Sequence, residues 1–481
     1  MSVTNSVEQF DLDSPLYQST RPNNNIDKIN EIEEEENSND NIIFQKDQEN
    51  RRKLSTNIKY CGIRGDSKIS CILNIAVSAI GGGCFLFPHI IYEGGIIVSL
   101  ACFLFITICI YYSVDLLRSF VVDTKYFSFA LMTEKTLGAT ALKVYAFCSF
   151  VIYTSMEVSY LSSIFLYVKG MYNLSGALAI FLYYLISMII EILICIYISK
   201  IINMHLLSII SITCFLLILI SLIVVAIVAN ATGEVHNKFI SDNLFFPELS
   251  EITFWNSLFK LSSYLMVYLY GFSYHSTFPT LIGSLKTVNN STTKKVHIIS
   301  FGIITIAYFA ISIFGYILSE VVPNELFQEN DDLFKDGWAT LRKPFKYSLI
   351  IFLLFVIPIR FITIRDNYIT LIGKQRMTIL KELPIVSLFI FICNILAFCI
   401  SLFETKLQKY QIKTLFQALG GIFGVIISFC LPVINYVSVN GKKKIKSIIG
   451  YLISFIFVLI AILSTGHTFY QIFIGYNKKE E

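Results

Sequence analysis

Three consecutive glycines interrupt an apolar stretch, and their backbone has the potential to bind a charged solute. Gly81, Gly82 and Gly83 lie in the middle of residues 70–95, with Pro88 shortly after them. Each glycine costs a helix about 1 kcal/mol relative to alanine, and proline removes a backbone donor. We therefore predict an unwound segment at membrane depth, where irregular backbone is tolerated only if protein buries it or a wet cavity adjoins it.

Such a break offers partners for both charges of a zwitterion. Freed backbone N–H groups, at the positive end of the following half-helix, suit a carboxylate. Carbonyls at the end of the preceding half-helix suit an ammonium group, so no charged side chain is required. The alternative is that the glycines only allow helices to pack closely. The substrate-binding residues predicted here are Ser78, Ile80, Gly81, Gly82 and Gly83, with Pro88 as the helix-breaking residue.

A second interrupted segment follows later in the chain. Gly271, Pro279 and Gly283 punctuate the apolar residues 257–282 and the positions just after them. Carbonyls freed near Gly271 would again suit an ammonium group. The substrate-binding residues predicted here are Gly271, Phe272, Ser273 and Tyr274, with Pro279 as the helix-breaking residue.

The elements that must position both segments are membrane spans. The chain has 481 residues, of which 55% are hydrophobic and 15% charged, and its mean hydropathy is +0.65. Soluble proteins carry about 25% charged residues. Apolar run lengths predict an all-α integral membrane protein of about eleven transmembrane helices. The predicted spans are 70–91, 96–117, 142–168, 175–198, 206–229, 257–282, 298–319, 347–371, 384–403, 413–437 and 447–468.

The two interrupted segments are spans one and six. Interruptions at corresponding positions of two five-span halves are typical of transporters with a five-plus-five inverted repeat, whose substrate site lies between the broken helices. Span eleven is then a peripheral addition.

The polar ends and loops predict the domain limits and the orientation. Residues 1–67 are predicted to be a disordered cytosolic tail, 68–470 the transporter domain, and 471–481 a short polar C-terminal tail. Lys and Arg are more frequent in the loops on the side of the N-terminal tail, which places that side in the cytosol and the C-terminus opposite.

Three titratable residues inside the spans are candidates for coupling or gating. His275 lies in the second interrupted segment and could gate the site or carry a proton; alternatively, a neutral imidazole bonds a carbonyl there. Glu157 and Glu191 lie in spans three and four, where ionisation would cost about 3 kcal/mol or more. Each is either a proton carrier, a partner for a cationic substrate, or a protonated acid bonding between helices.

Charged residues also lie near the ends of two spans. Arg360 and Arg365 occur toward the cytosolic end of span eight, with Asp366 adjacent, while Asp115 and Arg118 end span two. We predict coupling or gating roles for Arg360 and Arg365. The alternative is that such clusters anchor the helix at the membrane interface.

Several functional classes have no support in the sequence. It lacks HExxH, GxSxG and P-loop motifs, as well as a TVGYG-like ion filter, so neither an enzyme nor a channel of those kinds is indicated. No CxxC pair occurs among the eleven cysteines. We expect no cofactor, no metal and no nucleic-acid partner, and the oligomeric state stays open.

Three motifs resemble those of the amino acid/auxin permease family, within the amino acid–polyamine–organocation superfamily. The resemblance covers roughly residues 70–470. The segment from Gly271 through His275 to Pro279 is similar to the family's GHxxFPxI segment, especially in its vesicular and vacuolar branch. Span eight resembles a VxxP…PIR segment. The residues that match the family's opening pattern are Gly81, Gly83, Pro88, Glu93, Gly94 and Gly95.

The resemblance implies a secondary-active amino acid transporter that works by alternating access. Val77 stands where the family commonly has Asn, and Val356 stands where its sodium-coupled branch has a hydroxyl-bearing residue. The loss of these two candidate ligands favours proton coupling, exchange or facilitated transport over sodium coupling. It implies a plasma membrane or an acidic vacuolar membrane. The open alternatives are a carrier for polyamines or cationic amines, and an amino-acid sensor that signals through the N-terminal tail.

Overall fold

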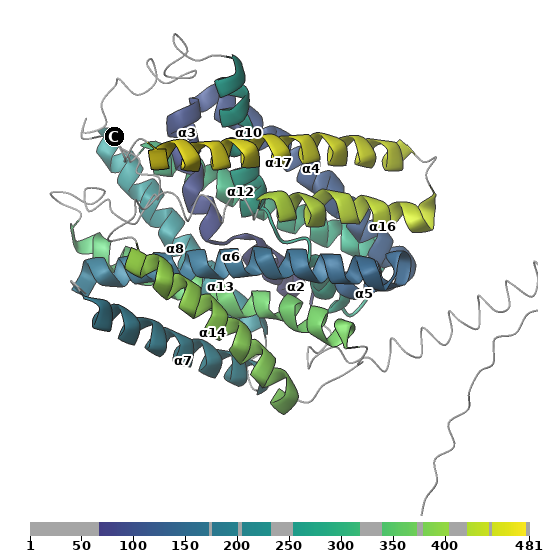
Figure 1. The fold of residues 1–481 in the computed structure, drawn as a ribbon, viewed down its shortest axis with the longest axis horizontal. Coiled ribbons are helices and arrows are strands. Elements are labelled where there is room, and N and C mark those ends of the chain that lie inside the picture. The colour runs from purple at the N-terminus through teal and green to yellow at the C-terminus, as the bar shows by residue number, and fades with distance from the viewer. Residues whose placement is uncertain are drawn as a thin grey trace, which may run out of the picture. The chain divides into compact units, whose positions relative to one another are not determined.

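The computed structural model describes residues 67–172, 176–200, 204–231, 254–317, 339–372, 379–403, 421–441 and 445–477. The predicted N-terminal tail, residues 1–67, lies outside these ranges except for Ser67, which caps the first helix. The elements assigned within them are helices, which agrees with the predicted all-α class (Figure 1).

The helices follow the apolar runs closely. The first half of the chain forms α2 (Lys68–Ala79), η2 (Gly82–Leu86), α3 (Phe87–Gly94), α4 (Ile96–Thr124), α5 (Phe129–Leu137), α6 (Ala139–Tyr172), α7 (Ala177–Lys200) and α8 (Met204–Ala231). The second half forms α10 (Phe254–Gly271), α11 (Phe278–Gly283), α12 (Asn290–Ile317), α13 (Ala339–Leu371), α14 (Ile379–Phe403), η4 (Ile426–Cys430), α16 (Leu431–Asn440) and α17 (Ile445–Asn477).

The span count differs slightly from the prediction of eleven. Within the described ranges, nine single helices are long and apolar enough to cross a membrane, and the bent pair of α2 and α3 makes a tenth span. The pair of α10 and α11 is not among them, because α10 carries Lys260 and several hydroxyl groups and α11 has six residues. This pair nevertheless holds the same position in the second half as α2 and α3 hold in the first.

Two short elements were not predicted. Helix α5 lies between spans two and three, and it is too short for a search based on long apolar runs to find. The π-helical turn η4 precedes Pro432, which is in the first turn of α16. Proline lacks a backbone donor, and a π-turn is a common way for a helix to absorb such a local mismatch.

The packing places the broken spans inside the bundle. Helix α12 packs against α2, α3 and α8, and α13 packs against α8 and α6. Helices α7 and α14 pack together and run side by side along the lower edge of the view (Figure 1). Large apolar side chains such as Leu104, Ile108 and Ile306 are exposed on the outside, where a bilayer would cover them.

Candidate functional site

The first break forms at the predicted glycines. Helix α2 ends at Ala79, and the N–H of Ile80 makes a last helical bond to the Ala76 carbonyl at 2.8 Å. Gly81 is extended, with φ −135° and ψ −176°, and the 3-10 turn η2 follows. The two halves of the span meet at a bend of 48°. Pro88 lies in the first turn of α3, where its missing donor costs nothing.

The second break has a matching form. Helix α10 ends at Gly271, and regular helix resumes at Phe278, with Pro279 in the first turn of α11. Between them the chain makes short turns, in which the N–H of Tyr274 donates to the Phe272 carbonyl at 2.9 Å. The prolines at both breaks therefore start the second half-helix, as the sequence indicated.

The two breaks touch each other through glycines. A Cβ atom added to Gly83 would lie 3.2 Å from the Cα of Gly271 and 3.2 Å from Cδ1 of Tyr270. A Cβ atom added to Gly271 would collide with the ring of Phe87. Close packing and helix breaking, considered as alternatives from the sequence, therefore occur at the same glycines.

A tyrosine from α12 joins the carbonyls of the two breaks. The hydroxyl of Tyr308 donates to the carbonyl of Ala79 at 2.6 Å and to that of Gly271 at 2.7 Å. Because a hydroxyl has one hydrogen, the two carbonyls share it. Sequence reasoning missed Tyr308, since nothing distinguishes it from the other tyrosines among the 27 in the chain.

The other predicted substrate residues differ in their surroundings. The Ser78 hydroxyl donates to the Ile75 carbonyl of its own helix at 2.8 Å. Ile80 is buried, and Phe272 packs edge-on against Tyr308, with ring centroids 4.7 Å apart. The hydroxyl of Tyr274 is buried and has no hydrogen-bond partner among the described residues. Backbone groups and aromatic surface thus dominate the meeting point of the breaks.

His275 lies in the second break and is fully enclosed. It is 1% exposed, and neither of its ring nitrogens has a hydrogen-bond partner in the described part of the chain. His297 of α12 lies within electrostatic range, and its own ring stacks on Tyr111 at 4.9 Å. The sequence reading singled out His275 but not His297, because His297 lies near the predicted beginning of its span.

The two predicted acids lie near each other across three helices. Glu191 of α7 accepts hydrogen bonds from Ser187 at 2.9 Å and from Asn394 of α14 at 3.1 Å. Glu157 of α6 lies within electrostatic range of Glu191, and its buried Oε1 has no hydrogen-bond partner in the ranges that the structure describes. Asn394 was missed, because a single amide in an apolar run has no distinctive pattern.

The arginines of α13 separate into two environments. Arg365 pairs with Asp366 at 3.1 Å, and Asp366 accepts a bond from Thr280 of α11 at 3.3 Å, so this pair links α13 to the second broken span. Arg360 instead reaches the first break. A Cβ atom on Gly81 would collide with its guanidinium, so a charged side chain adjoins this backbone.

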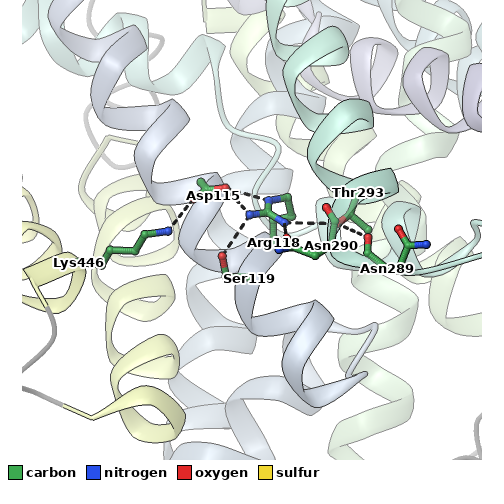
Figure 2. A network of polar contacts seen from close by, with 7 residues as sticks. All are labelled: Asp115, Arg118, Ser119, Asn289, Asn290, Thr293 and Lys446. Atoms are coloured by element: carbon green, nitrogen blue, oxygen red, sulfur yellow. Dashed lines mark hydrogen bonds and ion pairs between the residues drawn. The ribbon is translucent and has the colours of Figure 1, made fainter.

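A second polar cluster joins α4, α12 and α17. Figure 2 shows Arg118 between Asp115 of its own helix, at 2.8 Å, and Asn290 of α12, at 2.5 Å. Asp115 also pairs with Lys446 of α17 at 3.3 Å. The cluster therefore ties the second span, the seventh span and the last span together, which the sequence hinted at only through the proximity of Asp115 and Arg118.

Comparisons with known proteins give a family from the sequence and a fold from solved structures. The family described as "Transmembrane amino acid transporter protein" matches residues 64–473. No curated protein matches the sequence.

Solved structures of several membrane transport proteins are similar to this chain. One is a Na⁺-coupled sialic acid symporter, with 11% identity, TM-score 0.55, and coverage of 85% of this chain and 91% of that one. Another is a mutant of the Eremococcus coleocola manganese transporter, with 12% identity, TM-score 0.59, and coverage of 84% and 87%. The third is MhsT in complex with L-phenylalanine, with 15% identity, TM-score 0.52, and coverage of 83% and 99%. At these identities the likeness establishes the fold of inverted repeats and no more.

Proposed function

The chain belongs to the transmembrane amino acid transporter family, and we propose that its two touching helix breaks form the substrate site. Membership of this family makes it a secondary transporter of amino acids and not an enzyme. The observation that supports this site is the hydroxyl of Tyr308, which bonds one carbonyl from each break. Backbone polar groups inside a membrane protein need such a partner.

Alternating access would then act on these contacts. Ile80, Gly81, Gly271 and Phe272 are buried and Ser273 is half-buried, so substrate reaches the breaks when the broken spans move relative to the helices around them. A substrate ammonium group can replace the Tyr308 hydroxyl at the two carbonyls, because the ammonium group and the hydroxyl are both hydrogen-bond donors. The cluster of Asp115, Arg118 and Lys446 would hold one end of the bundle closed, and we assign that end to the cytosol from the distribution of Lys and Arg.

Proton coupling or exchange, rather than sodium coupling, completes the proposal. A sodium ion needs several oxygen ligands, yet Val77 and Val356 are buried apolar residues at two positions where oxygen ligands would be needed. The buried acids Glu157 and Glu191 offer sites for a proton, and an acidic vacuolar membrane would supply the gradient.

Uptake by liposomes that contain the purified protein tests this function. We expect a radiolabelled amino acid to accumulate when a pH gradient is imposed, and a sodium gradient alone to add nothing. Equal exchange under all conditions would support the exchanger form. Accumulation that requires sodium would contradict the proposed coupling, and uptake of polyamines without amino acids would contradict the proposed substrate.

Replacing Tyr308 by phenylalanine tests the junction of the breaks. We expect uptake to fall about tenfold, because the substrate-free carrier would have to close and return with buried carbonyls that lack their donor, at a cost of about 1–3 kcal/mol. The ring and its contacts with Phe87 and Phe272 remain. Initial uptake rates at equal amounts of reconstituted protein provide the measurement.

Ser312→Ala is the matched control for this variant. It removes a hydroxyl one turn along α12 that donates to the Tyr308 carbonyl within the same helix, at 2.7 Å. That carbonyl keeps its position in the helical ladder, so we expect uptake to change less than twofold. Wild-type uptake by Tyr308→Phe would show that the hydroxyl does not support the site.

A further inference from the structure

Arg360 is a buried cation without a carboxylate partner. Its side chain belongs to α13 and is 4% exposed. In the described part of the chain, no acid lies within ion-pair distance of its guanidinium. Nη1 donates to the sulfur of Met156, and Nε has no hydrogen-bond partner.

The neighbours of Arg360 compensate its charge only weakly. The guanidinium lies over the ring of Tyr160, with its central carbon 4.9 Å from the ring centroid. A thioether is a weak acceptor, and an aromatic face attracts a cation less strongly than an anion does. Burying an ionised group is costly unless it is paired, so this arrangement is incomplete until an anion arrives.

The position of Arg360 indicates where that anion would bind. A Cβ atom on Gly81 would collide with Nη2 of Arg360 and with the hydroxyl of Tyr160, so both groups lie directly against the unwound backbone of the first break. The extended conformation of Gly81 takes its N–H out of the helical ladder, while its carbonyl accepts a hydrogen bond from the N–H of Cys84 at 3.2 Å. Guanidinium donors and backbone thus converge on one point, and the fork of an arginine matches the two oxygens of a carboxylate.

We propose that Arg360 binds the carboxylate of the transported substrate, with Tyr160 holding the guanidinium in place. This inference rests on the proposed function and narrows it to solutes that carry a carboxylate. Amines and polyamines are rejected, because they would place a second positive charge beside a buried cation. The ammonium group of an amino acid would lie toward the carbonyls of Ala79 and Gly271, on the side of Tyr308.

Glu157 is the competing partner within the chain. It lies within electrostatic range of Arg360 but beyond ion-pair distance in this structure. If Arg360 merely balanced Glu157, its loss would impair all substrates alike. A carboxylate-binding residue has a different signature, because its loss changes selectivity between solutes that differ only in their carboxylate.

The test compares amino acids with their amides in wild-type protein, in Arg360→Gln and in Arg360→Lys. Uptake of a radiolabelled amino acid is inhibited with unlabelled L-leucine or L-leucinamide, and with L-phenylalanine or L-phenylalaninamide. We expect the wild type to prefer the acids by about 10–100-fold, as for a charge-assisted hydrogen bond worth about 1.5–3 kcal/mol. Arg360→Gln should lose this preference, and Arg360→Lys should retain part of it.

Lys346→Gln is the matched control, because it removes another buried cation of the same helix. Lys346 lies about 21 Å along α13 from Arg360, at 1.5 Å per residue, so selectivity should stay as in the wild type. A preference for acids that survives in Arg360→Gln would overturn the inference and leave the proposed function intact.

If Arg360→Gln does not fold, as judged by its melting temperature, the preference for acids over amides in the wild type and in Arg360→Lys still tests the inference. Equal inhibition of the wild type by acid and amide would overturn the inference. A wild-type protein that carries no amino acid would instead refute the proposed function itself, which the uptake panel detects without any variant.

Discussion

Replacing Gly271 by alanine is expected to reduce amino acid uptake by between about tenfold and hundredfold. The added Cβ atom would lie 2.9 Å from Cε1 of Phe87 and closer still to Cζ. Phe87 cannot easily turn away, because its ring packs against Tyr268 at 4.7 Å and Tyr308 at 5.2 Å. Overpacking of this kind costs about 1–3 kcal/mol and would force the two breaks apart. Initial uptake rates in liposomes measure the loss.

Gly302→Ala is the control for this substitution. Gly302 lies in α12, and a Cβ atom there would meet nothing within 4 Å. Alanine favours a helix over glycine by about 1 kcal/mol, so we expect normal uptake and an equal or higher melting temperature. Similar uptake by the Gly271 and Gly302 variants would show that the close contact of the breaks is not needed for transport.

Replacing Arg118 by glutamine should produce the largest loss of stability. Arg118 is 4% exposed, and it joins Asp115 at 2.8 Å to Asn290 of α12 at 2.5 Å (Figure 2). Removing one member of a buried pair costs about 3–5 kcal/mol, because the remaining charge loses its partner. Asp115 keeps a bond to Lys446, and its side chain is 19% exposed, so we expect about 3 kcal/mol. The melting temperature of the purified protein in detergent provides the measurement.

The variant Lys446→Gln removes the outer arm of the same cluster. The side chain of Lys446 is 50% exposed, and exposed ion pairs contribute about 0–1 kcal/mol. We therefore expect a change in melting temperature several times smaller than for Arg118→Gln. Equal changes would mean that the cluster acts as one exposed network and that burial of Arg118 adds little.

The local features of the fold were accessible from the sequence. Both helix breaks occur where glycine and proline interrupt apolar runs, since these residues act on their own backbone. The sequence motif predicted the pair of α10 and α11 as a broken span, although its polar residues make it too hydrophilic to be recognised by hydropathy alone. The short helix α5 and the π-turn η4 were not predicted, because neither produces a long apolar run of its own.

The candidate site was accessible only in part. Gly81, Gly83 and Gly271 were identified, but the contact between Gly83 and Gly271 was not. Arg360 was read as a residue of the cytosolic end of its span, whereas the structure places its guanidinium against Gly81. The position of a residue along a helix indicates its depth in the membrane but not the direction in which its side chain points. A long flexible side chain can also extend past one helical turn.

By itself the sequence determined the membrane class, the two interrupted spans and the family motifs, because apolar run length and backbone-breaking residues act locally. Only the tertiary structure decided which polar groups meet. Tyr308 bonds Ala79 across 229 positions of the chain, and Asn394 bonds Glu191 across 203. Such contacts depend on how helices rotate and pack against one another. The spacing of residues along one helix does not indicate how the neighbouring helix is oriented.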